Sequence, residues 1–487
     1  MGERIKQQLE LDNLENMAPQ YAPIYSLAEA NKENLFLPSA SLHLLKRQYQ
    51  SKLMREQTSI SIPTSISCSQ SGELSAVDII KVARESVSQC FYQNSGDFSY
   101  ANSGLPPEKY EDFELALLLQ AAAINFSNQQ FHLARTLLGT CRSSVSIIGS
   151  PMQRVVYYFT EALQERITVE MGGVVLKEIP EGNQMNPTVE EAFTGLQPGV
   201  MECQDKLPFC RTTQFTAVQA ILDNVTTAKR VHLIDLGIKS GSHWPILMQA
   251  LADRHECPLE FLKITAVGVS IEMIQEIGKK LSSFAESLNI PFSFKAVVSD
   301  LKNLDEHLFE LAADEAVAVY SELCLATLLA WPHHLESLLA TIKKLKPCVM
   351  VTIEIDSNTN AHNFMDRFNA SLSVSTALFD CLDNCMDPDS QGRAIIEGVF
   401  LREGIRYLIT STGKESIHRQ ESIDFWRAFL TRFGMVEIEL SNWALCQADL
   451  VVKSNPSWSS CTLEVNGKGL TVGWKGTPVH FLTVWKC

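Results

Sequence analysis

From residue 231 onward, short runs of β-branched residues alternate with longer segments whose apolar positions recur at helical spacing. Five strands are predicted at "VHLIDLG", "LEFLKITAVG", "FSFKAVVS", "AVAVYSE" and "PCVMVTIEID". Between them, helices are predicted over residues 245–254, 271–288, 302–313 and 333–345. Such alternation joins successive strands by right-handed crossovers into one mainly parallel sheet, so the pattern indicates an α/β fold.

The C-terminal part departs from this alternation. Strands are predicted at "MVEIELS", "CTLEVNGKGLTVGWKG" and "VHFLTVWK", and Asn466-Gly467 is a signal for a tight hairpin turn. A parallel sheet that ends in an antiparallel hairpin is the outline of the Rossmann-like fold of methyltransferases. That outline is an analogy of fold and says nothing of function.

Residues 113 to about 228 are predicted to be all-helical. Apolar residues recur every seven positions at Leu117, Ile124, Phe131 and Leu138. A coiled coil needs a second apolar column, and "NFSNQQ" interrupts the pattern, so two packed helices are favoured over one long zipper. A third helix begins after Ser150 as N-cap with Pro151 in its first turn. These residues are predicted to form a helical cap.

The first 108 residues differ from the rest. Stretches rich in Ser, Thr, Gln and turn residues predict a variable, partly disordered region with one or two short helices. A loose basic cluster of Lys46, Arg47, Lys52 and Arg55 fits either a nuclear address or a solvated helix face. The predicted organisation is a variable region over 1–108 and a folded domain over 109–487, with the α/β core at 229–487.

Composition narrows the classes of partner. Of 487 residues, 45% are apolar and the formal net charge is −15. DNA-binding proteins usually present a basic face, so here any such face must be local, and the balance favours protein partners. The 13 cysteines form no C-x-x-C pair, which indicates reduced thiols in cytosol or nucleus. No apolar run reaches membrane-spanning length without a charge.

The stretch "VHLIDLGIKSGSHWP" has the strand, glycine loop and helix start with which α/β proteins bind nucleotides or methyl donors. In methyltransferases an acidic residue precedes three alternating glycines. From Asp235 these would fall at 237, 239 and 241, but position 239 is a lysine that would crowd the donor. The next strand ends in Gly268 instead of a ribose-binding carboxylate, and Glu272 comes a turn too late. We therefore expect no cofactor, and a tight turn as the role of the glycines.

Other candidate chemistry is sparse. Glu354 and Asp356 lie at a strand end, where α/β active sites form, but without a nearby nucleophile a structural hydrogen-bonding role is favoured. Cys381 and Cys385 share a helix face and are expected to be buried thiols, not metal ligands. No serine-hydrolase elbow, zincin or Walker motif is present. Four tryptophans near the C-terminus (Trp443, Trp458, Trp474 and Trp485) fit core packing better than interface anchors.

Several ordered motifs together resemble the plant GRAS transcriptional regulators. The central signature is matched around the glycine loop, and later blocks are matched by "NAHNFMDRFNASLSVSTALFDCLD", by the segment around "DFWRAF" and by the C-terminal "GWKGTPVHFLTVWK". The family positions are Val231, His232, Ile234, Asp235, Gly241, Trp244, Arg367, Phe368, Arg419, Trp426, Trp443 and Trp474. Departures include Ser373 and Val374 in place of an aromatic pair. The core is DELLA-like, but residues 1–108 do not match the acidic N-terminal module of DELLA repressors.

The resemblance implies a helical cap over a Rossmann-like core, residence in the nucleus and control of transcription. It implies partners that are DNA-binding transcription factors and other GRAS proteins, in homo- or heterodimers, and it leaves direct contact with promoter DNA open. The expected partner surface is the helical stripe of Leu117, Ile124, Phe131 and Leu138. The alternative hypothesis is a methyltransferase-like enzyme or small-molecule sensor that uses the loop at 235–241.

Overall fold

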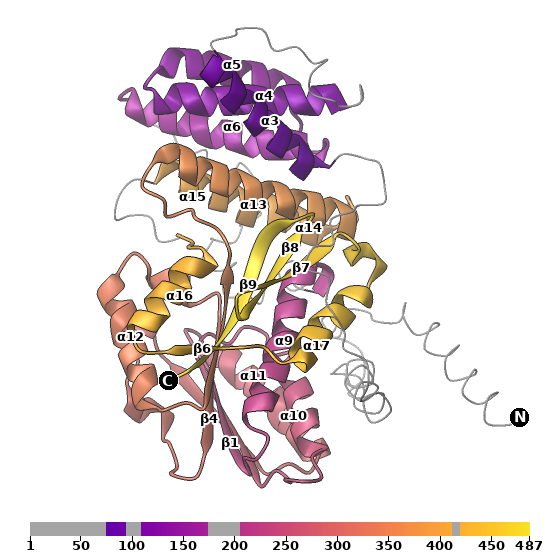
Figure 1. Cartoon of the computed structure of the whole chain (residues 1–487), viewed down its shortest axis with the longest axis vertical. Helices are drawn as coiled ribbons and strands as arrows, with labels where there is room; N and C mark the ends of the chain where they lie inside the picture. The colour runs from indigo at the N-terminus through magenta and orange to yellow at the C-terminus, as the bar shows by residue number, and fades with distance from the viewer. Residues whose placement is uncertain (1–74, 94–108, 174–204, 412–418) are drawn as a thin grey trace, which may run out of the picture.

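The computed structural model describes residues 75–93, 109–173, 205–411 and 419–487, which form a helical cap above an α/β core (Figure 1). The basic cluster at 46–55 lies outside the described residues. In the core, a single sheet has the strand order β3-β2-β1-β4-β5-β9-β8-β7, with β6 paired to β9. The bounds are β1 Arg230–Asp235, β2 Phe261–Gly268, β3 Phe292–Val298, β4 Ala316–Glu322, β5 Val349–Ile355, β6 Val436–Ile438, β7 Cys461–Asn466, β8 Gly469–Trp474 and β9 Thr477–Lys486.

The pairing confirms the predicted fold class. Strands β1 to β5 are parallel to their neighbours, and β9 returns antiparallel to β5 and pairs with β8 and β6. Strands β7 and β8 form the predicted hairpin, whose two turn residues are Gly467, with φ +57°, and Lys468, one position after the predicted Asn466-Gly467. Strand β5 is buried almost throughout, as expected of a central parallel strand covered on both faces.

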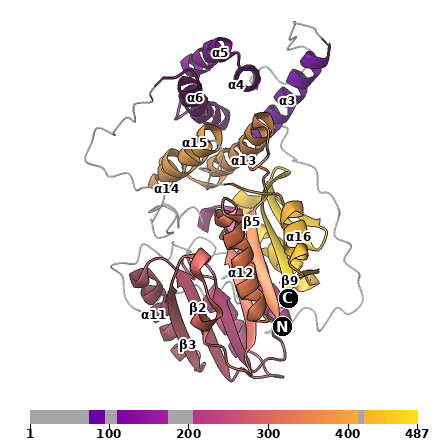
Figure 2. The same ribbon diagram turned by 90° about the vertical axis from the view of Figure 1, so that its left-hand side faces the viewer.

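Helices cover both faces of the sheet. On one face lie α9 (Pro208–Asn224), α10 (Trp244–Ala252), α11 (Ile271–Ser287) and α17 (Asn442–Lys453). On the other face lie α12 (Pro332–Lys344) and α16 (Ile423–Arg432) (Figure 2). Leu339 of α12 and Trp426 of α16 are buried in the same apolar cluster. Serine or asparagine side chains cap many of the helices by accepting from a backbone N–H of the first turn, among them Ser150, Ser270, Asn363, Ser422 and Ser441.

One predicted helix was wrong. Residues 302–313 form two short 3₁₀ turns, η4 (Leu301–Asn303) and η5 (Glu306–Phe309). Asp300 and Asp305 each accept from a backbone N–H two residues later, so each starts a turn of its own. Glu310 then takes a left-handed conformation with φ +48°, which ends the second turn. Two more 3₁₀ turns are η6 (Leu325–Leu328) and η9 (Pro456–Trp458), whereas η7 (Ile396–Leu401) is a short π-helix.

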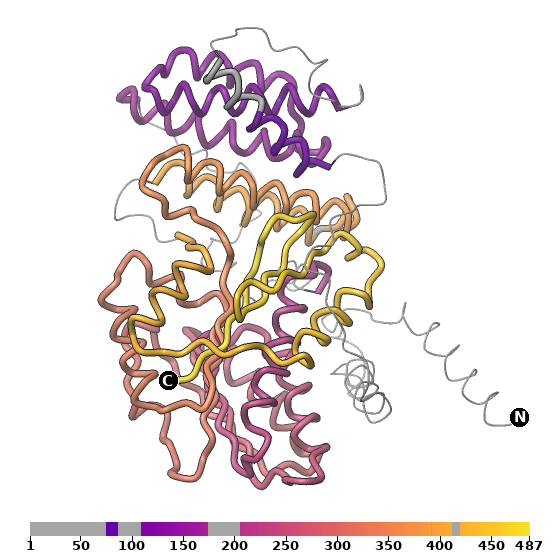
Figure 3. Tube along the Cα trace, viewed as in Figure 1, coloured from indigo at the N-terminus to yellow at the C-terminus, as the bar shows by residue number. Residues whose placement is uncertain are grey.

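The cap is built from two segments that are distant in sequence. Helices α4 (Tyr110–Ser127), α5 (Phe131–Ser144) and α6 (Pro151–Glu170) confirm the predicted two packed helices and third helix. After β5 the chain enters the cap again as α13 (Phe364–Cys385), α14 (Gln391–Ile395) and α15 (Arg402–Thr410), and then returns to the core (Figure 3). Phe368 and Ile405 are buried with the first three helices in one apolar cluster.

This arrangement corrects the expected division of the chain. Residues 364–410, expected in the core, complete the cap, because the apolar faces of α4 and α6 need α13 and α15 to cover them. Helix α9, expected in the cap, packs on the sheet against α17. Helix α3 (Ala76–Gln93) was expected in a poorly packed region, but Ile79 and Ala83 are fully buried against α4 and α13.

Candidate functional site

The site that the sequence singles out is the loop between β1 and α10. Strand β1 is buried and ends at Asp235. The carboxylate of Asp235 accepts a hydrogen bond from the backbone N–H of Gly237 (3.2 Å) and one from the indole N–H of Trp244 (2.9 Å). Burial raises the pKa of Asp235 to about 7, and the two hydrogen bonds act in the opposite direction. Asp235 therefore ties the loop to the first turn of α10.

The two loop glycines make room for side chains of the protein itself. A Cβ added to Gly237 would lie 2.3 Å from Sγ of Cys324, which follows β4. A Cβ at Gly241 would lie 2.9 Å from Cγ2 of Ile277 on α11, and Gly241 also has φ +63°. Sγ of Cys324 thus lies against Gly237, a contact that the sequence could not reveal.

The remaining requirements of a methyl-donor site are also unmet. Gly268 ends β2 and carries no carboxylate. Glu272 is exposed in the first turn of α11 and accepts from the hydroxyl of Ser270, so it belongs to the helix cap. The residues present do not fit adenosyl methionine. Among the described residues, no group of three or more His, Cys, Asp or Glu side chains could hold a metal ion.

Lys239 is an electrostatic partner of a buried carboxylate. Glu322 ends β4 and accepts from Nε2 of Gln214 (3.0 and 3.2 Å) and from the Tyr320 hydroxyl (2.9 Å). Burial favours the neutral acid, but the charge of Lys239, the nearby His243 and the hydrogen bonds from Tyr320 and Gln214 together lower the pKa of Glu322. In turn, burial acts to lower the pKa of Lys239, but Glu322 and other nearby acidic groups together raise it. Both groups are therefore charged at neutral pH.

The two acidic residues at the end of β5 hold the backbone, as predicted. An oxygen of Glu354 accepts from the N–H of Leu325 (2.8 Å), at the start of η6. Asp356 accepts from the N–H of Ile423 (3.2 Å), at the start of α16. Burial raises the pKa of Glu354 to about 7. Glu354 therefore holds the segment that follows the neighbouring strand β4, and Asp356 holds the start of α16.

The other family positions on β1 form part of the sheet core. Val231, Ile234 and His232 have no exposed surface. Nε2 of His232 lies 2.8 Å from the Thr265 hydroxyl, and Nδ1 lies 3.2 Å from a carboxylate oxygen of Glu315. Burial lowers the pKa of His232 to about 3, so its imidazole is neutral at neutral pH.

Two family arginines fasten the crossing from β5 to the cap. Arg367 donates to the carbonyl oxygens of Ala361 (2.9 Å) and His362 (2.7 Å). Arg419 donates to the side-chain oxygen of Asn360 (2.9 Å). Both arginines therefore hold the loop through which the chain enters the cap.

The tryptophans mainly fill the core, as predicted. Trp458, Trp474, Trp485 and also Trp426 are almost fully buried, whereas Trp443 is half-buried. Trp474 has a further role because its indole N–H donates to Asp380 on α13 (2.6 Å). Asp380 also lies 2.8 Å from the Lys475 ammonium. These contacts join β8 of the core to α13 of the cap.

The predicted partner stripe lies largely inside the cap. Leu138 is fully buried, so it cannot contribute to an outer surface. Leu117 and Phe131 are half-buried against the cap core, and Ile124 is half-buried. Most of the stripe cannot serve as an outer surface because Leu117, Phe131 and Leu138 lie on the faces with which α4 and α5 pack.

Other apolar residues of the cap are exposed. At one end of the α5–α6 hairpin, Ile147 and Ile148 are 52% and 91% exposed in the connecting turn. At the other end, Leu133, Val169 and Met171 are 40–55% exposed, and Arg135 donates to Thr168 there. The sequence signal for the first pair was the apolar doublet in "SVSIIGSP", just before the Ser150 N-cap.

Comparisons with known proteins agree with the geometry. The model of the GRAS domain family matches residues 115–486. The DELLA protein RGL3 of Arabidopsis thaliana is 33% identical over 375 residues, which cover 76% of this chain and 68% of RGL3. The DELLA protein GAI1 of Vitis vinifera is 30% identical over 374 residues, 76% of this chain and 61% of GAI1.

A solved structure shares the fold. The crystal structure of SCL7 in Oryza sativa superposes with a TM-score of 0.65 at 27% identity, covering 72% of this chain and 94% of SCL7. In the described part of the chain, no helix is long and apolar enough to cross a bilayer. The family model spans most of the chain and the relatives match it over three quarters of its length, so this protein belongs to the GRAS domain family of plant transcriptional regulators.

Proposed function

We propose that this chain acts in the nucleus as a co-regulator that catalyses no reaction and docks DNA-binding transcription factors or other GRAS proteins through the outer side of its cap. The observation that carries the proposal is the exposure of Ile147 and Ile148 in the α5–α6 turn. Adjacent apolar side chains that stand in solvent mark interaction surfaces more often than singly scattered ones do.

The state of the β1–α10 loop supports a role without catalysis. Sγ of Cys324 lies against Gly237, and the indole N–H of Trp244 donates a hydrogen bond to the carboxylate of Asp235. Lys239 is engaged electrostatically with Glu322. A surface on the cap, away from this loop, is then the part of the molecule on which regulation depends.

Charge pairing favours protein over DNA as the direct contact. The net charge is −15. Many described cations already have carboxylate partners, among them Arg406 with Glu165 (2.7 Å) and Arg427 with Glu437 (3.1 Å). Cations engaged in this way contribute less to phosphate binding. Association with promoter DNA would require a local basic groove.

The test is a promoter-tethered reporter combined with pairwise binding to a panel of purified transcription factors and GRAS proteins. We expect Ile147→Asp/Ile148→Asp to abolish binding and the transcriptional effect while leaving the fold intact. The matched control is Leu311→Asp, which changes a 40% exposed leucine on the core. Equal activity of the cap variant and the control would contradict the proposal. Anisotropy with promoter fragments over a salt series tests the DNA route, for which we expect no binding at physiological salt.

A further inference from the structure

The sheet ends at β3, a strand with one unpaired edge among the described residues. Strand β3 pairs in parallel with β2. The carbonyl oxygen of Pro291 accepts from the N–H of Leu262, and the N–H of Ser299 donates to the carbonyl oxygen of Gly268. The backbone N–H and C=O groups of the odd-numbered residues of β3 therefore face β2. The N–H and C=O groups of Phe294 and Ala296 therefore point away from the sheet. Such an edge can accept another extended chain.

The usual protection of an edge strand is weak here. Exposed edges are normally blunted by charged side chains, proline or a covering segment. The one charged residue of β3 is Lys295, and its ammonium lies 2.6 Å from Glu310 on the opposite side of the strand from Phe294. At the end of β3, Val298 is 52% exposed, and the neighbouring Val269 is 67% exposed.

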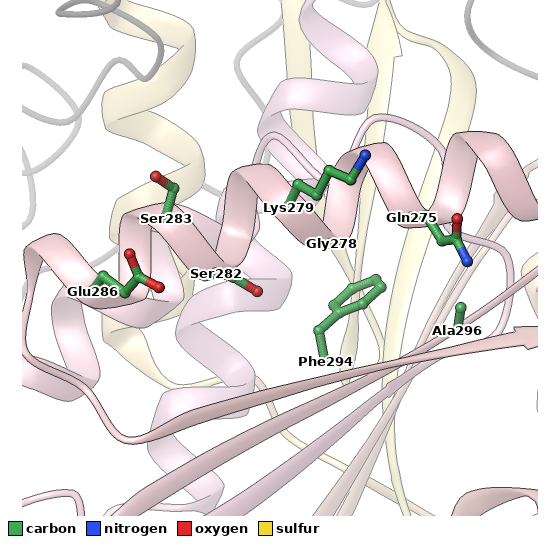
Figure 4. Close-up of a pocket in the computed structure, with 8 residues that line it drawn as sticks. All are labelled: Gln275, Gly278, Lys279, Ser282, Ser283, Glu286, Phe294 and Ala296. Atoms are coloured by element: carbon green, nitrogen blue, oxygen red, sulfur yellow. The ribbon is translucent and has the colours of Figure 1, made fainter.

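A groove runs beside this edge, between α11 and β3 (Figure 4). Phe294 and Ala296 form its floor, and Gly278 allows the Phe294 ring to lie under the helix, since a Cβ there would be 2.4 Å from the ring. Small and polar residues of α11, among them Ser282 and Gln275, form its wall. The groove can take side chains that alternate along a chain paired with β3.

Two charged residues of α11 on the wall of the groove favour a chain with complementary charges. Lys279 and Glu286 line the groove and have no ion pair within the described residues, whereas the adjacent Lys280 is paired with Glu276. Seven helical positions separate them, which is roughly 10 Å along the helix axis. Four residues of an extended chain span roughly 13 Å and keep both side chains on one face, and the long side chains of Lys279 and Glu286 can bridge the difference.

We propose that the β3 edge binds an extended segment of a partner protein as an additional antiparallel strand. The segment carries apolar residues at alternate positions, then an acidic residue beside Lys279 and, four residues later, a basic residue beside Glu286. This order follows because an antiparallel strand runs from the Val298 end of β3 towards its start. The interaction is separate from the cap surface and does not depend on it.

The probe is a synthetic nine-residue peptide with threonine at even positions, valine at positions one, three and seven, aspartate at five and lysine at nine. Binding to the full chain is measured by titration calorimetry, and backbone amide NMR shifts locate it. We expect shifts at Phe294 and Ala296. Ala296→Pro removes the backbone N–H of residue 296, which points away from the sheet and makes no hydrogen bond to β2. We expect this variant to bind the peptide about tenfold more weakly. Ala296→Val keeps the N–H and is the matched control.

A charge exchange provides the second arm and does not depend on the fold of the proline variant. We expect Lys279→Glu to weaken binding about fivefold and a peptide with lysine in place of aspartate to restore it. Lys280→Glu, beside it, is the control and should have little effect. Absence of binding at millimolar peptide, or binding that is indifferent to both Ala296→Pro and Lys279→Glu, would overturn the proposal.

Discussion

The indole N–H of Trp244 donates a 2.9 Å hydrogen bond to the carboxylate of Asp235, nine residues earlier in the chain. In a ligand-binding loop of this fold, that acidic position and the glycines beside it face the ligand. Here the same carboxylate holds the first residue of α10 in place. In this chain the signature residues around Asp235 therefore make packing and hydrogen-bonding contacts within the protein.

Replacement of Trp244 by Phe should destabilise the fold in a pH-dependent way. The variant leaves a buried carboxylate short of one donor, which costs about 1–3 kcal/mol. Because burial already raises the pKa of Asp235 to about 7, and loss of the Trp244 hydrogen bond raises it further, the folded state binds a proton more tightly than the unfolded chain. Stability from this group is present at low pH and is lost as pH rises through the folded pKa.

The measurement is urea unfolding of both proteins at pH 6 and pH 8, with a larger difference expected at pH 8. Trp485→Phe is the control, because that indole donates to the uncharged hydroxyl of Thr483 (2.9 Å). Its destabilisation should be the same at both pH values. A pH-independent effect of Trp244→Phe would contradict the assignment.

Gly237→Ala should destabilise the protein by about 1–3 kcal/mol, because the new methyl group meets Sγ of Cys324 at 2.3 Å. Removing that sulfur in Gly237→Ala/Cys324→Ala leaves the Cys324 Cβ at an ordinary 3.8 Å. We therefore expect the second substitution to restore part of the stability. A double-mutant cycle from chemical unfolding measures this coupling, and strict additivity would show that the contact is unimportant.

Adenosyl methionine should give no binding heat with the wild-type protein in titration calorimetry. The reason is the contact of Cys324 with Gly237, together with the absence of a ribose-binding carboxylate at the end of β2. A measurable heat that Gly237→Trp abolishes would instead favour the enzyme or sensor alternative. A chemically inert analogue that lacks the methyl group provides a second probe.

Asp380→Ala should weaken the junction of cap and core by about 2 kcal/mol or more. It leaves the buried N–H of Trp474 without its acceptor and removes the partner of Lys475. Asp380→Asn keeps an acceptor for the indole and should be milder. Unfolding followed by tryptophan fluorescence and by far-UV circular dichroism reports both effects. If the two substitutions have equal effects, the indole hydrogen bond contributes little.

Arg154→Met should cost about 3 kcal/mol or more, because it breaks a buried ion-pair network in the cap. Arg154 lies 3.1 Å from Glu397 and 3.0 Å from Asp383, and Arg393 contacts the same two carboxylates. Burial raises the pKa of Glu397 and the arginines oppose it, so loss of Arg154 raises that pKa further. The variant should lose stability as pH rises towards neutrality.

Thermal unfolding over a pH series checks this expectation. Arg154→Lys keeps the charge but not the fork that reaches several oxygens, so its effect should be intermediate. The control is Lys453→Met, which removes an exposed pair with Asp449 and should change little. A pH profile of Arg154→Met parallel to that of the wild type would contradict the role of Glu397.

Local patterns determined much of this protein. The β-branched runs, the hairpin turn after Asn466 and the Ser150-Pro151 helix start depend on neighbours in sequence, and each lies at or next to its predicted place. The motif positions, quoted in order, identified the family. The hydrogen-bonding role of Glu354 and Asp356 followed from their place at a strand end.

Long-range packing decided the rest. Only the tertiary structure shows that Cys324 contacts Gly237 and that residues 364–410 belong to the cap and not to the core. It also shows that Leu138 is buried whereas Ile148 is exposed. Burial of an apolar stripe depends on which other helix covers it, and that helix here comes from a segment more than two hundred residues away. Periodicity reveals that a face is apolar, whereas its exposure is a property of the assembled layers.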